Sequence, residues 1–437
     1  IATDGLAIYY EPSWLGGRYR EDRTQVNRVY LHMVLHAIFR HITGRKGRDR
    51  RYYDLACDIA AESVIDGLPN RCVRGLKSFP RRETYRRLKE KMKVLIVGSG
   101  GREHAIAYSV AKSDKVDKIY CTPGNAGISE YAECAPIGAM EFDKITAFAK
   151  EKEVDLVIVG MDDPLVGGLV DCLEAEGIRT FGPTKAAAIL EGSKAFSKDL
   201  MKKYNIPTAA YENFTDPEKA LSYLETAKYP IVLKADGLAL GKGVLICNTL
   251  EEAKEGVRTI MQDKKFGDAG NEMVIEEFMT GREVSVLSFV DGKTIKTMTS
   301  AQDHKRAGDG DTGLNTGGMG TFSPSPFYTK EVDEFCQKHI YQATVDAMRA
   351  EGRPFKGVIF FGLMLTEEGP KVLEYNARFG DPEAQVVLPR MKNDIIEVVE
   401  ACIDGTLDQV DLQFEDNAAV CVCLLYTSPS PRDMRRS

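Results

Sequence analysis

A run of apolar residues that leads directly into a glycine turn constrains this chain most strongly. Residues 93–97 read Lys-Val-Leu-Ile-Val, a Gly-Ser-Gly-Gly turn follows at 98–101, and a helix is predicted from about Glu103. Three more apolar strands, separated by helical patterns, are expected at 118–121, 155–159 and 179–181. Continuous apolar strands that alternate with helices are typical of a parallel sheet covered on both faces. We therefore predict an α/β, doubly wound N-terminal domain over residues 92–192.

Residues 193–414 show a different pattern. Residues 231–234 and 243–246 flank a glycine-rich turn, which predicts an antiparallel hairpin. Further strands are expected at 273–276, 283–290, 358–365 and 371–375. This order predicts an α+β domain with a mostly antiparallel sheet. The stretch 301–324 is rich in glycine and shows no regular period, so we expect a long loop there, and loops of that length are usually functional or disordered.

The first 91 residues differ from this central part in charge. They contain 19 Lys and Arg against 11 Asp and Glu, whereas the whole chain has a net charge of −7. Such a break indicates two unrelated pieces or a basic arm for nucleic acid. Because the basic residues are scattered among ordinary helical patterns, we favour an unrelated, mainly helical segment over residues 1–91. We interpret Met92 as a start codon and the whole as a chimeric chain.

The other end of the chain changes character as well. A strand expected at 418–424 indicates the start of a third, C-terminal domain, which we place at 415–424 and interpret as truncated. Residues 425–437 carry Pro, Ser and Arg without periodicity and resemble translated cloning or adapter sequence. We predict that they form a non-native tail.

Composition excludes several classes of protein. The chain is 43% hydrophobic and 28% charged, as in a soluble globular protein. No run of 18 or more apolar residues is present, so no membrane-spanning helix is predicted. The ten cysteines lack zinc-site spacing and are expected to be reduced and mostly buried. No signal or transit pattern is visible, so a cytoplasmic protein is expected.

The glycine turn at 98–101 is suited to an anion, because backbone amides at a helix start can approach a ligand closely. A dinucleotide fingerprint would need a third glycine at 103, where Glu103 stands, and an acidic residue at the end of the second strand, where Cys121 stands. NAD binding is therefore disfavoured and phosphate binding remains. The alternative is a tight strand-to-helix turn with no ligand.

A second glycine-rich segment follows Lys234 at the end of a predicted strand. It contains Gly237, Gly241 and Gly243 with Lys242 between the last two. A P-loop would need four residues between its glycines and Ser or Thr after the lysine, and neither condition is met. A flexible flap over a triphosphate fits, with Lys234 as a point charge on phosphate. A purely structural hairpin is the alternative.

Two further strand ends carry polar residues. Alternation along a strand places Glu374 and Asn376 on one face, and a carboxylate with an amide oxygen suits Mg²⁺ that is held partly by phosphates. The alternative is the exposed face of an edge strand. Residues 276–279 also end a strand, where backbone groups could bind an adenine edge, while Glu283 could bind ribose hydroxyls. Glutamates that simply face water would explain the same pattern.

Together these features resemble the ATP-grasp ligases in order and spacing. The matching features are Glu191-Gly192-Ser193-Lys194-Ala195-Phe196, the Lys234 hairpin, the 276–279 segment, and Glu374 with Asn376. Other stretches are similar to the glycinamide ribonucleotide synthetase family, namely Gly98–Ala105, Pro123–Gly127, Phe181–Thr184, Gln302–Arg306, Asn315–Gly320 and Asn376–Glu383. The resemblance covers residues 92 to about 424 without a gap.

The resemblance implies an ATP-dependent ligase that joins glycine to 5-phosphoribosylamine through a glycyl phosphate, with ATP and Mg²⁺ or Mn²⁺. It implies catalytic roles for Lys234, Arg378 and Asp381. The residues implied to bind ATP are Lys194, Lys234, Gly241, Lys242, Gly243, Glu276, Glu277, Phe278, Met279 and Glu283. Those implied to bind the substrates are Gly98, Gly100, Gly101, Arg102, Glu103, His104, Asn125, Asp303, His304, Lys305, Arg306, Asn315, Thr316, Gly317, Gly318 and Met319. The implied metal ligands are Glu374 and Asn376.

The resemblance also implies a monomer that binds small molecules and neither nucleic acid nor membrane. The chain departs from the family pattern at Met161 and Asp162, where many relatives have Pro and Glu, and at Leu314, where many have Pro. Two alternatives stay open. One is another ATP-grasp ligase, such as a biotin-dependent carboxylase component or a formate-using purine enzyme, although the segment 303–320 argues against it. The other is an inactive, truncated fragment.

The first segment carries one motif of its own. His32 and His36 stand four residues apart on a predicted helix, as in zinc-binding helices, and Asp58 could be a further ligand. Met33 occupies the place of the catalytic Glu in His-Glu-x-x-His. The segment resembles the start of a metallopeptidase-like domain that precedes von Willebrand A-like proteins. An ordinary amphipathic helix is the alternative.

Overall fold

The computed structural model describes residues 2–3, 8–9, 27, 30–32, 34–35, 91–238, 243–308 and 312–422. The chain divides into two compact units, residues 1–91 and residues 92–437. In the first unit β1 (Ala2–Thr3) pairs antiparallel with β2 (Ile8–Tyr9). His36, Asp58 and the tail 425–437 lie outside the described residues, so the zinc hypothesis and the tail assignment stay predictions.

The second unit begins with a five-stranded parallel sheet. Its strands in spatial order are β5 (Glu133–Cys134), β4 (Val116–Pro123), β3 (Met92–Gly98), β6 (Leu156–Val159) and β7 (Thr180–Phe181). All neighbouring strands in it are parallel. Because chain order runs outward from β3 in both directions, the predicted doubly wound sheet is confirmed.

Alternate residues of β3 face different cores, as expected for a strand covered on both sides. Val94 and Ile96 pack with α5 (Gly101–Val110) and α16 (Ile395–Asp404). Leu95 and Val97 pack with α6 (Phe142–Glu151) and α8 (Leu169–Ala175). A short helix, α7 (Asp162–Gly167), follows β6 and ends at Gly168, whose φ of 98° suits glycine.

Two antiparallel four-stranded sheets follow, which confirms the predicted α+β region. The first has the order β10 (Val244–Cys247), β9 (Ile231–Ala235), β11 (Met273–Glu277) and β8 (Tyr211–Phe214). The second has the order β13 (Ile295–Thr297), β12 (Arg282–Asp291), β16 (Lys356–Thr366) and β17 (Gly369–Asn376). The predicted hairpin is the β9–β10 pair.

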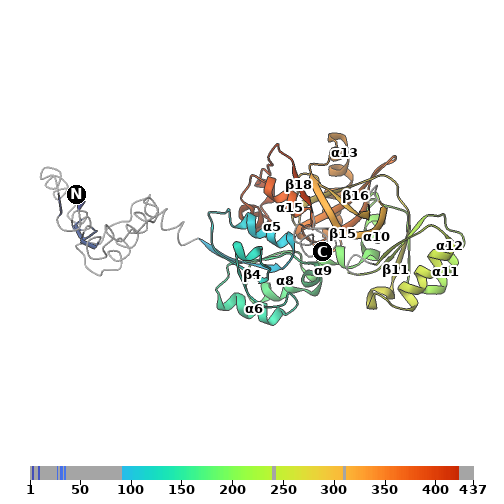
Figure 1. Cartoon of the computed structure of the whole chain (residues 1–437), viewed down its shortest axis with the longest axis horizontal. Helices are drawn as coiled ribbons and strands as arrows, with labels where there is room; N and C mark the ends of the chain where they lie inside the picture. Colours follow the sequence, from blue (N-terminus) through green and yellow to red (C-terminus); the bar gives the residue numbers. More distant parts are fainter. Residues whose placement is uncertain are drawn as a thin grey trace, which may run out of the picture. The chain divides into compact units, whose positions relative to one another are not determined.

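Helices cover these sheets. They are α9 (Lys185–Gly192), α10 (Lys194–Lys203), α11 (Pro217–Leu224), α12 (Leu250–Val257), α13 (Lys330–Cys336), α14 (Gln342–Ala350) and α15 (Ala384–Val387). Figure 1 shows α11 and α12 beside β11, and these elements share one apolar core. Among the described residues no helix is long and apolar enough to cross a membrane.

The prediction of a long loop at 301–324 was wrong. The segment forms β14 (Gln302–Gly308) and β15 (Thr312–Ser323), an antiparallel pair with irregular register, and β18 (Ala419–Val422) adds to β15. In β14 the residues on both faces are mainly polar. Asp303 and Lys305 line a charged cavity while His304 between them is exposed. A search for apolar alternation therefore could not detect it.

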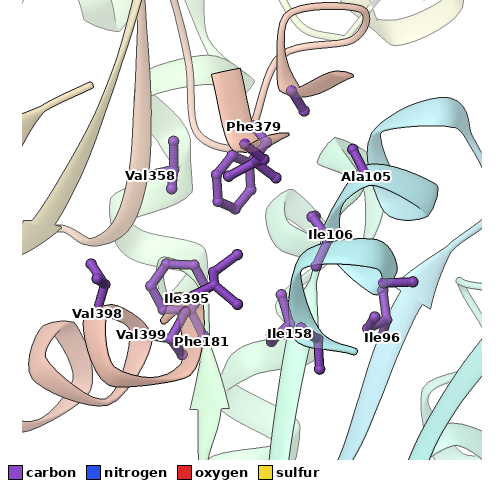
Figure 2. Packing of buried hydrophobic residues seen from close by; sticks show 14 of the residues in the cluster. Ile96, Ala105, Ile106, Ile158, Phe181, Val358, Phe379, Ile395, Val398 and Val399 are labelled. Atoms are coloured by element: carbon purple, nitrogen blue, oxygen red, sulfur yellow. The ribbon is translucent and has the colours of Figure 1, made fainter. Parts of the chain in front are cut away.

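One apolar core joins the parallel sheet to the antiparallel region (Figure 2). Ile106 of α5 and Ile158 of β6 belong to the same buried cluster as Phe379 and Val399. Phe379 lies three residues after the end of β17 and is 2% exposed. This packing holds the segment after β17 beside the glycine turn at 98–101, so two regions with candidate site residues meet.

Candidate active site

A cavity of about 350 Å³ is bordered by both antiparallel sheets, β14 and α10. Part of its wall is apolar and includes Val232, Ile246, Met279, Met364 and Leu373. Another part is highly charged and includes Lys194, Lys198, Lys234, Glu276, Glu283, Asp303, Lys305, Glu374, Arg378, Asp381 and Glu383. An apolar wall beside converging charged groups suits a ligand with a flat apolar ring and an ionic tail.

Lys194 is held at the start of α10. Ser193 caps this helix by accepting a hydrogen bond from the Phe196 amide, so the position after it is fixed. The Lys194 ammonium donates to the Gly237 carbonyl at 2.6 Å, which connects α10 to the start of the glycine-rich hairpin. Burial lowers the pKa of Lys194. A phosphate beside this ammonium would favour its charged form.

A buried triad of charges lies deeper in the cavity. Glu276 on β11 pairs with Lys234 on the neighbouring strand β9, and its other oxygen lies 2.5 Å from the Lys198 ammonium. The three residues are 2%, 5% and 3% exposed, respectively. Burial alone would raise the pKa of Glu276, but the two lysines outweigh burial and lower it. The carboxylate is therefore ionised and fixes both ammonium groups.

Lys198 is also bound from a second side. Its ammonium donates to the Thr208 hydroxyl at 2.7 Å, and Thr208 donates to the Val372 carbonyl of β17 at 2.7 Å. Burial lowers the pKa of Lys198 to about 8. This network connects α10, β11 and β17, the elements that carry three groups of predicted site residues.

A second charged group surrounds Lys305 on β14. Its ammonium lies 3.2 Å from Glu283 and 3.6 Å from Glu374. Burial alone would lower the pKa of Lys305, but Glu374 and Glu283 outweigh burial and raise it. Burial likewise opposes ionisation of Glu374, yet Lys305 and Lys234 bring its pKa below the ordinary value. Glu374 is therefore an ionised carboxylate at the cavity wall.

Arg378 organises the next part of β17 and the turn after it. Its guanidinium lies 3.2 Å from Glu191 and 3.8 Å from Asp162. Glu191 also accepts a hydrogen bond from the Ala377 amide at 2.7 Å. The amide nitrogen of Asn376 donates to Glu191 Oε1 at 3.0 Å. The amide oxygen of Asn376 therefore remains available as an acceptor.

Glu374 and Asn376 therefore fit the chemistry of a divalent-metal pair. A carboxylate and an amide oxygen are hard oxygen ligands, and both residues line the cavity. Among the described residues, no cluster of three or more His, Cys, Asp or Glu side chains could hold a metal ion by itself. A metal at this pair would need further oxygen ligands from phosphate or water.

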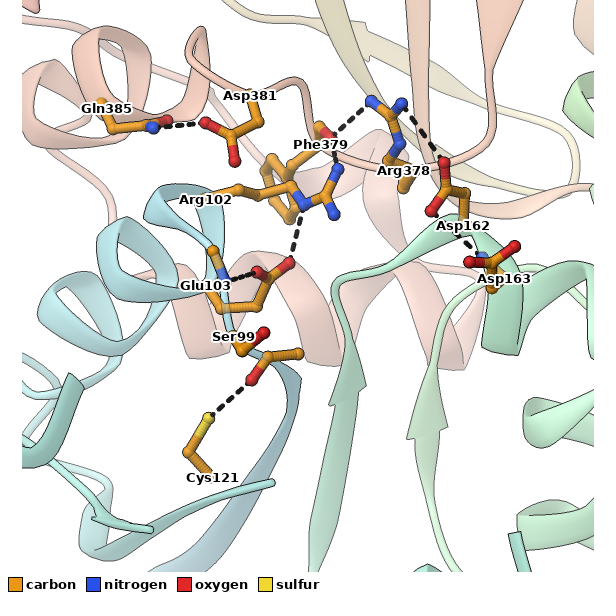
Figure 3. A network of polar contacts seen from close by, with 12 residues as sticks. Ser99, Arg102, Glu103, Cys121, Asp162, Asp163, Arg378, Phe379, Asp381 and Gln385 are labelled. Carbon is orange, nitrogen blue, oxygen red and sulfur yellow. Dashed lines mark hydrogen bonds and ion pairs between the residues drawn. The ribbon is translucent and has the colours of Figure 1, made fainter. Parts of the chain in front are cut away.

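The glycine turn after β3 is held by buried charges (Figure 3). Glu103 is 0% exposed and accepts from the Gly100 amide at 2.6 Å and from Arg102 Nε at 2.7 Å. A side chain at Gly98 would place its Cβ 2.4 Å from Glu103 Cδ, and φ at Gly98 is 143°. Glu103 thus occupies space that glycine leaves open.

The same turn contacts the segment after β17. Arg102 Nη1 donates to the Phe379 carbonyl at 3.2 Å, a bond drawn in Figure 3. A Cβ added at Gly100 would lie 3.0 Å from Asp381 Oδ2, and one at Gly318 would lie 2.6 Å from Pro382 Cδ. The backbone at Gly100 therefore approaches a carboxylate that lines the cavity, with no side chain between them.

Half of the thirty predicted site residues line this cavity. Its lining includes Lys194, Lys234, Gly243, Glu276, Glu277, Phe278, Met279, Glu283, Asp303, Lys305, Thr316, Glu374, Asn376, Arg378 and Asp381. Gly98, Gly100, Gly101, Arg102, Glu103, His104, Asn125, His304, Gly318 and Met319 are not part of the lining. Gly241 and Lys242 lie outside the described residues, as do the side chains of Arg306 and Asn315 and the surroundings of Gly317.

Several residues outside the lining hold the loops around it. Asn125 donates to the Ser99 carbonyl at 2.8 Å and accepts from the Ile128 amide at 2.9 Å, so its amide joins two loops. The His104 ring lies against Gly127, where an added Cβ would be 2.8 Å from His104 Cε1. Their direct contact with a substrate stays a prediction.

Sequence reasoning missed Lys198, Glu191 and Glu383. Lys198 stands four residues after Lys194, so both share one face of α10, and this spacing could have indicated it. Glu191 and Glu383 belong to motifs that were recognised, but nothing in the sequence shows that they are buried. Both line the cavity, and burial raises the pKa of each.

Comparisons with known proteins identify the family to which residues 92–384 are similar. A family model described as "Phosphoribosylglycinamide synthetase, N domain" matches residues 92–191, and one described as "Phosphoribosylglycinamide synthetase, ATP-grasp (A) domain" matches residues 192–384. A model described as "Putative metallopeptidase domain" matches residues 1–136 and overlaps the first of these.

Individual proteins are similar over the same region. A phosphoribosylamine–glycine ligase of Brucella melitensis is 51% identical over 333 residues, covering 76% of this chain and 78% of that protein. A crystal structure of a phosphoribosylamine–glycine ligase from Thermotoga maritima has a TM-score of 0.64 and 33% identity, covering 76% and 79% of the two chains. A biotin carboxylase domain from Hydrogenobacter thermophilus has a TM-score of 0.60 at 18% identity, over 75% and 73%, which is a likeness of fold alone.

Proposed function

This chain belongs to the phosphoribosylglycinamide synthetase family, and from that membership we propose how its residues carry out the reaction. The chain is a phosphoribosylamine–glycine ligase, which uses ATP to join glycine to 5-phosphoribosylamine in purine synthesis. One observation supports the roles proposed for the residues: the glycine turn approaches Asp381 of the charged cavity at Gly100. Two binding regions thereby face one reaction centre.

ATP occupies the cavity in this proposal. Its adenine lies against the apolar wall near Met279 and Met364, and the backbone at 277–279 binds the ring edge. Lys194 and Lys234 bind the phosphates, and Glu283 binds the ribose. Because Glu276 holds Lys234 in place before ATP binds, little side-chain freedom is lost on binding.

The chemistry is two substitutions with no covalent bond to the protein. Glycine's carboxylate attacks the γ-phosphate, which gives glycyl phosphate and ADP. The ribosylamine nitrogen then attacks the acyl carbon, and inorganic phosphate leaves with the bonding electron pair. Catalysis is therefore positioning and charge neutralisation. Arg378 and Asp381 lie where the two halves of the site meet and are proposed to orient the acyl phosphate and the amine.

Mg²⁺ or Mn²⁺ fits the pair formed by Glu374 and Asn376. The ion would neutralise phosphate charge when bound there. Lys305, which lies 3.6 Å from Glu374, would compete with a metal for that carboxylate. We therefore expect Lys305 to move or to share the carboxylate when nucleotide and metal bind.

The test is the substrate requirement of phosphate release. With ATP and Mg²⁺, release should require glycine and phosphoribosylamine together, and mass spectrometry should identify an amide product. Lys234→Met should abolish turnover, whereas Lys150→Met, which changes an exposed ion pair with Glu176, should leave it intact. Turnover with bicarbonate or formate in place of glycine would instead favour another ATP-grasp ligase.

A second experiment tests whether the length of the chain limits its activity. The chain spans 78% of the Brucella melitensis ligase. If the unaltered chain does not turn over, joining a family C-terminal domain after Leu424 should restore activity. Failure of the extended protein as well would contradict the assignment.

Residues 1–91 are proposed to be a separate segment with no part in the reaction, and a cytoplasmic monomer is proposed for the ligase. The segment forms its own compact unit. A metallopeptidase family model matches residues 1–136, which include the segment and extend beyond it. Zinc measured in purified protein tests the hypothesis that His32 and His36 bind metal. Stoichiometric zinc that is lost in His36→Ala would support it, and a zinc-free protein would exclude it.

A further inference from the structure

The second substitution of the proposed reaction requires a proton acceptor. An amine that attacks an acyl phosphate must lose one proton for a neutral amide to form. The lysines around the phosphates are donors rather than acceptors, and Glu276 is already bound between two of them. The following inference rests on the proposed function and identifies the acceptor among the remaining acidic residues of the cavity.

Asp303 has the geometry of such an acceptor. It lies on β14 with its side chain at the cavity, one strand position away from the exposed His304. Its Oδ1 is shielded from solvent and has no hydrogen-bond partner among the described residues. A buried carboxylate oxygen without a partner is unfavourable unless a ligand supplies a donor. An amine is a ligand that does so.

Asp303 also stands between the two binding regions. On one side, Lys305 of the same strand face contacts Glu374 and Glu283 at the proposed nucleotide end. On the other side, a Cβ added at Gly318 would lie 3.1 Å from Asp303 Oδ1 and 2.6 Å from Pro382. Pro382 follows Asp381, which approaches the glycine turn at 98–101. In the proposed reaction, the amine and the acyl phosphate have to meet between the nucleotide end of the cavity and the glycine turn at 98–101, which is where Asp303 lies.

We propose that Asp303 is the proton acceptor for the amine in the second substitution. The amine nitrogen forms a bond to the acyl carbon, and the bond from that carbon to the phosphate oxygen breaks. Inorganic phosphate leaves with the bonding pair, and one N–H proton passes to the Asp303 carboxylate. The step balances without any further reactant. Solvent or phosphate receives the proton afterwards.

The surroundings of Asp303 make its carboxylate a suitable base. Burial and the nearby Glu383 raise the pKa of Asp303 to about 7, Glu283 adds to the rise, and Lys305 and the His304 amide oppose it. An acceptor with a pKa near the working pH is both ionised and basic enough to take the proton. Glu383 is less suited, because its Oε1 already accepts from the Ser285 hydroxyl at 3.1 Å.

The experiment separates the two substitutions with hydroxylamine as a trap. Hydroxylamine converts glycyl phosphate to a hydroxamate without phosphoribosylamine, so it reports the first substitution alone. Asp303→Asn should form hydroxamate within about threefold of the unaltered chain. Its rate with phosphoribosylamine should fall by about 100-fold or more, as for loss of a general base. Glu334→Gln, which changes an exposed residue of α13, serves as the matched control.

A pH profile gives a readout that a purely structural role would not change. In the unaltered chain, kcat/KM for phosphoribosylamine should fall below a pKa near 7, because the protonated carboxyl cannot accept a proton. Asp303→Asn should lack this acidic limb, and Asp303→Glu should retain it with a partly restored rate. A limb that persists in Asp303→Asn would overturn the proposal.

The remaining outcomes are decisive as well. Equal loss of hydroxamate and amide formation in Asp303→Asn would assign the residue to glycine binding and overturn its role as acceptor. Equal retention of both would do the same. If neither the unaltered chain nor the chain extended with a family C-terminal domain forms hydroxamate from glycine and ATP, the proposed function fails first. The two failures are therefore distinguishable.

Discussion

Removing the carboxylate of Glu276 should strongly destabilise the sheet formed by β10, β9, β11 and β8. Glu276, Lys198 and Lys234 are each at most 5% exposed, and the carboxylate is bound to both ammonium groups. Glu276→Gln leaves two buried lysines without a compensating charge. Breaking a buried ion pair by removing one partner costs about 3–5 kcal/mol. We expect Glu276→Gln to lower stability by an amount in this range, because the Glu276 carboxylate compensates the charges of both Lys198 and Lys234.

Hydrogen exchange at the amides of β9 and β11 measures this loss where it arises. The free energy of opening reported by those amides should fall by about 3–5 kcal/mol in Glu276→Gln. Glu176→Gln removes a carboxylate from an exposed pair with Lys150 and should change the opening free energy of the same amides by less than about 0.5 kcal/mol.

A double variant tests the cause. Adding Lys198→Met to Glu276→Gln removes one of the two uncompensated charges, so the double variant should be more stable than the single one. A loss below about 1 kcal/mol in Glu276→Gln would refute the reasoning. The reasoning would also be refuted if the stability lost in the double variant equalled the sum of the losses in Glu276→Gln and Lys198→Met. Coupled residues deviate from additivity by about 0.5–3 kcal/mol.

Three other predictions test separate parts of the molecule. Glu374→Gln should lower the rate on the order of 100-fold and raise the Mg²⁺ requirement in a titration of phosphate release, and an unchanged requirement would contradict the metal assignment. Gly98→Ala places a Cβ 2.4 Å from Glu103 Cδ, so kcat/KM for phosphoribosylamine should fall at least about 10-fold while hydroxamate formation changes little. Deleting residues 1–91 should leave ATP affinity unchanged by calorimetry, because the ligase begins with its own buried strand at β3, and a large loss would show that the segment packs on the ligase.

The regular parts of the fold could be predicted because apolar residues mark them. The strand at Lys93–Val97 and the hairpin around Lys234 were recognised from apolar runs and glycine. The pair Glu374 and Asn376 followed from alternation along one strand. In each case a short-range pattern contains the information, since a strand repeats every two residues.

Other parts could not be predicted because they depend on contacts between distant segments. The β14–β15 hairpin was missed because its inward side is a charged cavity rather than an apolar core. Glu103 gives no sign in the sequence that it is buried against Gly98 and Gly160. Likewise, Glu276 could equally have faced water, and only the neighbouring strand and α10 show that two lysines enclose it.

The bond from Arg102 to the Phe379 carbonyl joins residues that are 277 positions apart. Ribosomes add roughly 5–20 residues per second, so about 14–55 s pass between synthesis of these two residues. During that time the nascent parallel sheet has neither Phe379 nor α16 to cover Ile106. The growing chain therefore presents an apolar surface outside the ribosome for tens of seconds, and it should be a client of chaperones that bind apolar segments during translation.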